Sequence, residues 1–152
     1  MRSRHIIISL LCAGVALAGC RSHAHKESSA TPITARPEAH AITASLNVRA
    51  ADKDVRFALH LVNTGKKNLE VNFPNGQSYD FAVVDSLGRE VWRWGRGRMF
   101  TQTLRNKFLD GGASFDVAER WSALPAPGRY TAIATLTSSN YPVVERVDFT
   151  VP

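Results

Sequence analysis

Apolar and polar residues alternate along most of the chain after residue 44. In residues 55–61 (VRFALHL) every second residue is a large apolar one, which is the period of a β-strand with one buried face. Further stretches repeat this period, and turn residues such as those at 63–66 (NTGK) separate them. The inward rows predicted in this way are Leu46/Val48/Ala50, Val55/Phe57/Leu59/Leu61, Leu69/Val71/Phe73, Phe115/Val117/Trp121, Tyr130/Ala132/Ala134/Leu136 and Val143/Val147/Phe149/Val151.

No stretch after residue 44 shows the period of a helix. Successive short strands with turn signals between them predict an antiparallel β-sandwich, with an open barrel as the alternative. The run Pro127-Gly128-Arg129-Tyr130 resembles the start of a late strand in many immunoglobulin-like domains. We therefore expect one all-β domain over residues 44–152, folded as an immunoglobulin-like antiparallel β-sandwich.

The segment from Phe73 to Gln102 predicts a β-hairpin followed by a loop. Residues 79–84 form the first strand, residues 85–88 (DSLG) carry turn chemistry with Gly88 free to take a positive φ, and residues 89–94 return. Trp92 and Trp94 are two apart and share one face, where we expect them to cover the core. An exposed aromatic binding patch is the alternative. Two amides, Gln77 and Gln102, are expected to be buried.

Residues 95–98 (GRGR) break the return strand, and residues 99–102 (MFTQ) are expected to resume extended structure. The candidate partner-binding loop runs from Gly95 to Phe100, because it combines charged side chains with apolar anchors. Its flanking glycines predict a flexible loop, and ordering such a loop on binding costs affinity. An ordinary connection between two strands is the alternative. The candidate contact residues are Arg96, Arg98, Met99 and Phe100.

Three runs in this segment, F-P-N-G-Q-S-Y-D-F, D-x-x-G-x-x-V-W-R-W and M-F-T-Q, resemble the signature of the BsuPI-type intracellular proteinase inhibitor family of bacteria. The resemblance continues through Trp121 and into residues 127–130, so it covers most of the chain after residue 44. It implies a proteinase inhibitor whose partner is a serine protease. A binding module at the cell envelope that does not inhibit, and that takes a protein or polymer partner, is the alternative from another class.

Residues 1–19 have the features of a lipoprotein signal peptide: a basic start, then an apolar stretch shorter than the roughly 20 residues of a membrane span. It ends in Leu-Ala-Gly before Cys20, which resembles a lipobox, so we expect Cys20 to carry lipid with palmitate among its acyl groups. The alternatives are an ordinary secretory signal, in which Cys20 has no role, and a cytosolic protein with an apolar start. Residues 20–43 are rich in Ala, Ser, Thr and Pro and predict a disordered tether. We expect attachment to the cell envelope, at the outer membrane if the cell has two membranes, since Arg21 follows the cysteine.

Charge and candidate chemistry favour binding over catalysis. The net charge is +6 with no run of Lys or Arg longer than two, which argues against a nucleic-acid partner. Both cysteines, Cys12 and Cys20, precede the domain, so it has neither a disulfide nor a thiolate nucleophile. His60 is the one histidine after residue 44 and lacks a nucleophile motif near it. The His23/His25 pair lacks further ligands. We expect no enzymatic activity, no metal and no cofactor.

Overall fold

The computed structural model describes residues 41–51, 53–123 and 125–152, and its regular secondary structure is β throughout these ranges. The expected signal peptide, Cys20 and nearly all of the expected tether lie outside the described residues. The first strand begins two residues before the expected start at Ala44. The strands of the described ranges are β1 (Ile42–Ala51), β2 (Asp54–Asn63), β3 (Leu69–Phe73), β4 (Tyr79–Asp85), β5 (Glu90–Arg93), β6 (Arg105–Leu109), β7 (Ser114–Trp121), β8 (Gly128–Leu136) and β9 (Val143–Val151).

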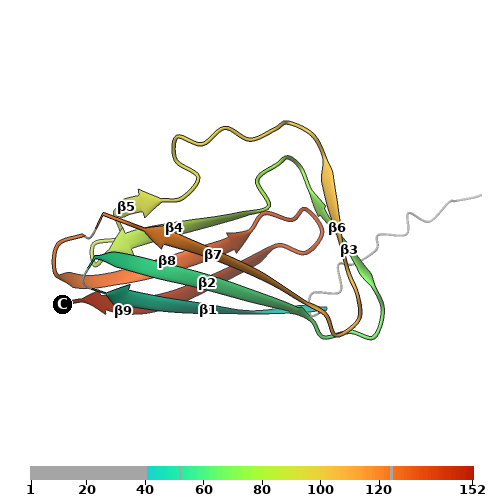
Figure 1. Cartoon of the computed structure of the whole chain (residues 1–152), viewed down its shortest axis with the longest axis horizontal. Coiled ribbons are helices and arrows are strands. Elements are labelled where there is room, and N and C mark those ends of the chain that lie inside the picture. The colour runs from blue at the N-terminus through green and yellow to red at the C-terminus, as the bar shows by residue number, and fades with distance from the viewer. Residues whose placement is uncertain (1–40, 52, 124) are drawn as a thin grey trace, which may run out of the picture. The chain divides into compact units, whose positions relative to one another are not determined.

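The strands form two packed layers, as the alternating pattern predicts. One layer contains the sheet β1-β2-β7 and the other contains the sheet β5-β4-β8-β9, with every pairing antiparallel. A short two-stranded sheet, β3-β6, stands at one end of the sandwich (Figure 1). The three sheets are separate, so the antiparallel β-sandwich is confirmed and the barrel alternative is wrong for the described residues.

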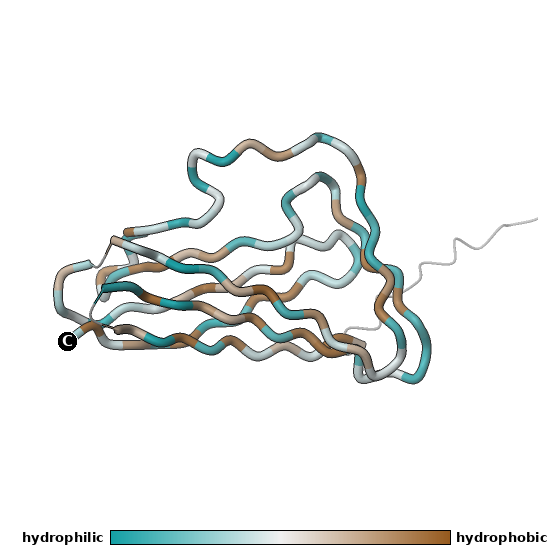
Figure 2. The backbone as a smooth tube through the Cα atoms, viewed as in Figure 1, coloured by the Kyte–Doolittle hydropathy of each residue, from teal (hydrophilic) through white to brown (hydrophobic). Residues whose placement is uncertain are grey.

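The core lies between the layers, and Phe57 of β2 is at its centre. The Phe57 ring packs against Phe81 of β4 at 5.7 Å and against Trp92 of β5 at 5.2 Å between centroids. Trp121 of β7 also stacks on Trp92, with 5.6 Å between ring centroids. The inward row of β2 is fully buried, and apolar and polar residues alternate along the strands that enclose the core (Figure 2). The predicted strand faces are therefore correct for β2, β3, β7, β8 and β9.

β4 differs from its expected half-buried character because both of its faces are covered. Asp80 and Ala82, which alternate with the inward residues, are 7% and 4% exposed. β4 lies between β5 and β8, and Arg93 of β5 pairs with Ala82 across the ladder. Arg93 also places its guanidinium on the Asp80 carboxylate, 2.6 Å from Nη1 to Oδ2. A charged neighbour thus covers the outer face, which an alternating pattern within one strand cannot predict.

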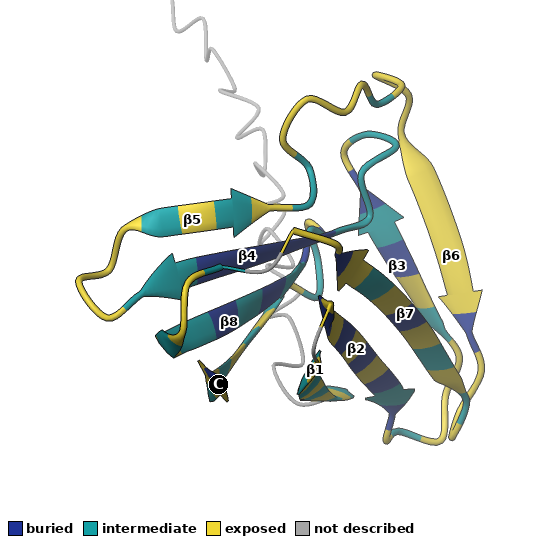
Figure 3. Cartoon of the chain, turned by 60° about the vertical axis from the view of Figure 1, so that its left-hand side comes forward, coloured by how far each residue is buried: buried dark blue, intermediate teal, exposed yellow. Residues whose placement is uncertain are grey.

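β6 is a strand that the sequence pattern does not predict. Its first four residues are exposed and only Leu109 is buried, so it has no apolar alternation (Figure 3). β6 is defined instead by its pairing with β3. The register runs from Leu69 opposite Leu109 to Phe73 opposite Arg105. Residues 99–102, expected to be extended strand, belong to the connection that precedes β6.

A buried amide joins β2 to the turns around β3 and β6. Asn63 is fully buried, and its Nδ2 donates to the carbonyls of Lys67, Leu109 and Asp110 at 2.8–3.0 Å. Its Oδ1 accepts from the N–H of Gly65 at 2.9 Å. Because a buried amide must be hydrogen-bonded, Asn63 fixes the position of the β3-β6 end against the sandwich.

Candidate functional site

The candidate site begins at the β4–β5 hairpin, whose turn the sequence predicts. Gly88 takes a φ of 77°, and Asp85 accepts backbone hydrogen bonds from Leu87 and Arg89, both at 2.9 Å. These hydrogen bonds, with that from the Arg89 side chain, lower the pKa of Asp85 below its usual value. The ladder register then shifts between Val83 and Val84, so that Val83 faces Trp92 and Val84 faces Glu90. The bulge sets which residues of β5 reach the core.

A long loop, residues 94–104, leaves β5 and crosses to β6, and it forms the arch above the sandwich in Figure 1. Its first part is fixed by Gly95, whose N–H donates to Oδ1 of Asp80 at 2.9 Å. A Cβ at Gly95 would lie 2.8 Å from Nε2 of Gln77 and 3.2 Å from Oδ1 of Asp80, so a larger residue here would require these side chains to move. Near its other end, the carbonyl of Thr101 accepts from the N–H of Gly76 at 2.8 Å. The loop is therefore attached to β4 through Asp80 and to the β3–β4 connection through Gly76.

A charge network holds the base of the loop. Arg93 contacts Asp80 at 2.6 Å and Glu90 at 2.5 Å, and Arg96 contacts the second Glu90 oxygen at 2.6 Å. Hydrogen bonds from Arg93, followed by those from Arg96, lower the pKa of Glu90 below its usual value. The same carboxylates raise the pKa of Arg93. Arg96, expected from sequence to be a free contact residue, thus has its guanidinium bound on the hairpin.

An aromatic cluster supports the middle of the loop. Trp94 stacks on Tyr79 at 4.6 Å and contacts Phe100 at 5.7 Å between ring centroids. Arg98 lies over the Trp94 ring at 4.3 Å, and its Nε donates to the Trp94 carbonyl at 3.0 Å. Tyr79 in turn donates its hydroxyl to Glu119 at 2.7 Å; burial and this hydrogen bond raise the pKa of Tyr79 to about 12. Both tryptophans therefore pack on the sandwich, as expected, but Trp94 does so beneath the loop.

The structure separates the four predicted contact residues into two kinds. Arg96, Arg98 and Phe100 each contact the hairpin or Trp94, whereas Met99 is 97% exposed. Among the described residues, none makes a backbone or side-chain hydrogen bond with Met99. Within the loop, Met99 is an exposed apolar side chain whose two neighbours contact Trp94. Leu104, at the end of the loop before β6, is also exposed, at 77%.

The sequence interpretation missed the residues that fix this loop. Asp80 and Gly76 act through contacts with Gly95 and Thr101, which are well separated from them in the chain, whereas Glu90 contacts the nearby Arg93 and Arg96. Their only sequence signal is their place inside the family-like runs. The expected burial of Gln102 is wrong: its side chain is exposed and donates to the carbonyl of Phe100 at 3.2 Å. Gln77 is half-buried beside Gly95.

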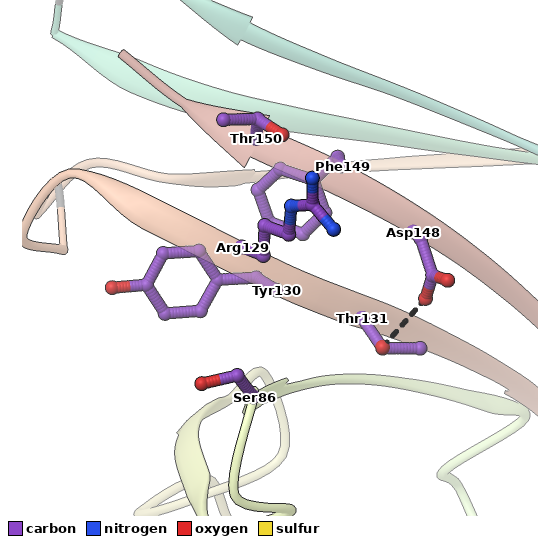
Figure 4. A pocket seen from close by; sticks show the side chains of 7 residues that line it. All are labelled: Ser86, Arg129, Tyr130, Thr131, Asp148, Phe149 and Thr150. Carbon is purple, nitrogen blue, oxygen red and sulfur yellow. Dashed lines mark hydrogen bonds between the residues drawn. The ribbon is translucent and has the colours of Figure 1, made fainter.

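Outside the loop, the described residues include a surface pocket and a histidine–carboxylate contact. A surface pocket of about 400 Å³ lies over β8 and β9 next to Ser86, where Thr131 donates to Asp148 at 2.6 Å (Figure 4). Figure 4 shows Arg129 and Tyr130 spread along its wall without converging on one point. His60 contacts Asp116 on the exposed face of β2 and β7. The described ranges contain no group of three or more potential metal-ligating side chains and no helix that could span a membrane.

The domain is thus a β-sandwich with one long loop, residues 94–104, which is hydrogen-bonded to the domain near both ends and exposes Met99 and Leu104. The sequence model of the BsuPI family, described as "Intracellular proteinase inhibitor", matches residues 42–141. The chain therefore belongs to this family, as its sequence motifs indicate. The matched region contains the whole loop and both strands that carry it.

Solved structures resemble the chain only distantly. A β-glucosidase from Erythrobacter marinus has 15% identity and a TM-score of 0.44 over 73% of this chain, which spans 15% of the β-glucosidase. The yjhA protein from Bacillus subtilis has 15% identity and a TM-score of 0.42, covering 76% of this chain and 94% of its own. The putative ApaA protein from Bordetella pertussis has 14% identity and a TM-score of 0.41, covering 72% and 91%. Among curated proteins, none matches this sequence.

Proposed function

We propose that this protein inhibits a serine protease by inserting the loop of residues 94–104 into the active-site cleft, with Met99 in the main specificity pocket. One observation carries the proposal: Met99 is 97% exposed while the side chains on both sides of it are held by Trp94. Binding energy at interfaces concentrates in a few anchors that become buried. Met99 is the most exposed large apolar residue of the loop, ahead of Leu104 at 77%.

The backbone around Met99 supports the same mode of binding. Proteases bind inhibitors and substrates as extended segments that pair with an active-site strand. Met99 has backbone groups that no described residue uses, while Gly95 and Thr101 are hydrogen-bonded to the domain on either side. Such anchoring reduces the conformational entropy lost on binding, which is a main cost of association.

The occupied arginines indicate the type of protease. To enter a trypsin-like pocket, Arg96 or Arg98 would first have to leave Glu90 or Trp94, whereas Met99 has no such contact to give up. Methionine is flexible and apolar and adapts to a broad hydrophobic pocket. We therefore propose a subtilisin-like enzyme rather than a trypsin-like one as the target.

The test is an inhibition assay against both kinds of protease with Met99→Ala. Inhibition of the subtilisin-like enzyme should weaken at least tenfold, which is about 1.4 kcal/mol. The matched control is Leu87→Ala, because Leu87 is also exposed, at 74%, but lies in the β4–β5 turn. Met99→Arg should shift inhibition towards the trypsin-like enzyme. Equal inhibition constants for wild type, Met99→Ala and Leu87→Ala would place the contact surface elsewhere, and no inhibition by wild type would favour a non-inhibitory envelope module.

We further propose that the domain is attached to the cell envelope through lipid on Cys20. The support is the basic start, the apolar stretch and the Leu-Ala-Gly-Cys run of residues 17–20. Two or more acyl chains, each contributing about 0.8 kcal/mol per buried CH₂, give stable anchoring. Metabolic labelling with a fatty acid should mark wild type and fail to mark Cys20→Ser; equal labelling of both would contradict the anchor.

A further inference from the structure

Three arginines stand in one row on the outer face of the β1-β2-β7 sheet. The ladders place Arg49 of β1 opposite Arg56 of β2, and Arg56 opposite Arg120 of β7. All three are exposed, and the side chains of Arg56 and Arg120 are 67% and 61% accessible. Adjacent strands lie about 4.8 Å apart, so the row spans about 10 Å.

The next row of the same face is made of small residues. Asn47, Ala58 and Ala118 are opposite one another on the same three strands. Because these side chains are short and the arginines beside them are long, the face has a trough of about 680 Å³. The trough is lined by Asn47, Arg49, Arg56, Phe57, Ala58, Ala118, Glu119 and Arg120. Its floor is apolar and one wall is cationic.

The row of three arginines lowers the stability of the sheet unless an anion offsets the charges. Like charges directly opposite in a sheet repel each other. Within the described residues, one carboxylate contacts the row: Asp54 lies 3.2 Å from Nε of Arg56 and 3.5 Å from Nη1 of Arg120. That contact shows that one carboxylate can bridge neighbouring arginines of the row. Each guanidinium has five N–H donors, so the solvent side of the row keeps donors for further carboxylates.

We propose that this trough binds an extended acidic segment of a partner protein, with its carboxylates on Arg49, Arg56 and Arg120. In an extended chain, side chains two residues apart point the same way at about 7 Å spacing, so two of them reach along a row of about 10 Å. Their methylene groups would cover Ala58 and Ala118. The site lies on a different sheet from the strands of the loop of residues 94–104, and it is independent of the proposed inhibition.

The charge and shape of the trough favour an acidic protein segment over a bilayer surface or a phosphate. Arginine matches the planar carboxylate with paired N–H donors. A bilayer surface would touch only the raised arginines, since the face carries no large apolar side chain beside the row that could insert. Backbone N–H groups of the sheet interior are used in the ladders, so a phosphate would lack the backbone donors on which many anion sites rely.

The test uses the full chain and a fluorescent peptide of alternating Glu and Ser, with a Gln-Ser peptide as the neutral probe. Fluorescence anisotropy should show binding of the Glu-Ser peptide alone. The triple variant Arg49→Gln/Arg56→Gln/Arg120→Gln should weaken it at least tenfold and reduce its salt dependence. The control is Arg146→Gln, an exposed arginine on β9 of the other sheet, which should leave binding unchanged. Undiminished binding by the triple variant would overturn the proposal.

A second variant separates the trough from simple charge attraction. Ala58→Leu keeps all three arginines but fills the floor, and it should weaken binding of the Glu-Ser peptide severalfold with an unchanged melting temperature. Binding that is unaffected by Ala58→Leu would overturn the trough as the site. Preferential binding of inorganic polyphosphate, or of vesicles containing anionic phospholipid, over the acidic peptide would also overturn the assignment of the occupant.

Discussion

Trp92 and Trp94 are the same residue type on the same face of the hairpin, yet they belong to different structures. Trp92 stacks on Phe57 and on Trp121 and packs against the core as a partly buried residue. Trp94 lies between Tyr79 and Phe100, with Arg98 over its ring. One tryptophan joins the two sheets, and the other joins the loop of residues 94–104 to the sheet edge.

Their environments also differ in how well polar groups are satisfied. Nε1 of Trp94 is buried without a hydrogen-bond acceptor among the described residues, which costs free energy. Trp94 is therefore held by ring stacking and by the Arg98 cation. Trp92 is held instead by its contacts with the core, where apolar surface is buried. The difference indicates that domain stability and loop position can be changed separately.

The largest effect is expected in the core around Trp92. Phe57→Ala removes the ring that contacts both Phe81 and Trp92, and should lower the free energy of unfolding by about 3–5 kcal/mol. Denaturant unfolding measures this directly. Phe108→Ala is the matched control, because Phe108 is a phenylalanine in a strand but is 70% exposed. Similar losses for the two variants would contradict the assignment of the core.

Replacing each tryptophan with leucine tests whether Trp92 supports the stability of the domain and Trp94 the position of the loop. Trp92→Leu should destabilise the domain by about 2–4 kcal/mol and leave inhibition by the folded protein intact. Trp94→Leu should cost about 1–2 kcal/mol, since its ring packs on Tyr79 and the loop and not on Phe57, but should weaken inhibition at least tenfold by releasing Arg98 and Phe100. Unfolding curves and inhibition constants of both variants are needed. If Trp92→Leu weakened inhibition more than Trp94→Leu, the two roles would be reversed.

These two tryptophans also show what sequence can predict here. Their spacing placed them on one face, and the alternation of β2 identified Phe57 and its neighbours as core, because a period of two maps directly onto a buried face. The different fates of Trp92 and Trp94 depend on tertiary contacts with Trp121 and Phe100. Local periodicity carries no information about such contacts.

For the candidate site the same limit applies. The loop could be located by its composition, and the family resemblance is confirmed by the match over residues 42–141. The sequence could not predict that Met99 is exposed while Arg96 and Arg98 contact the domain. These contacts depend on where Glu90 and Trp94 lie in the folded structure. β6 was missed for a related reason: its pairing with β3 defines it, and its own residues lack a period.

A smaller effect is expected from pH, through the network at the base of the loop. The pKa of Glu90 is lowered in the folded state, so its stabilising effect is fully present above the ordinary pKa and is lost as pH falls through the folded value. Glu90→Gln should remove about 0.5–1 kcal/mol at neutral pH and reduce the loss of stability below about pH 4.5. Unfolding free energies at pH 3–7 measure this. Glu145→Gln, on β9 and without an ion pair to the described residues, should keep the wild-type profile; an unchanged profile for Glu90→Gln would contradict the network.

The smallest effect is expected on the exposed face of β2. His60 is next to Leu59 and Leu61 in sequence but points away from the core, and its contact with Asp116 is solvent-exposed, with side chains 47% and 69% accessible. Exposed ion pairs contribute about 0–1 kcal/mol, so His60→Ala should change the free energy of unfolding by less than about 1 kcal/mol. A shift of the strand by one residue would exchange its two faces completely. A loss for His60→Ala that approached that of Phe57→Ala would therefore show that the register of β2, and with it the place of Trp92 in the core, is wrong.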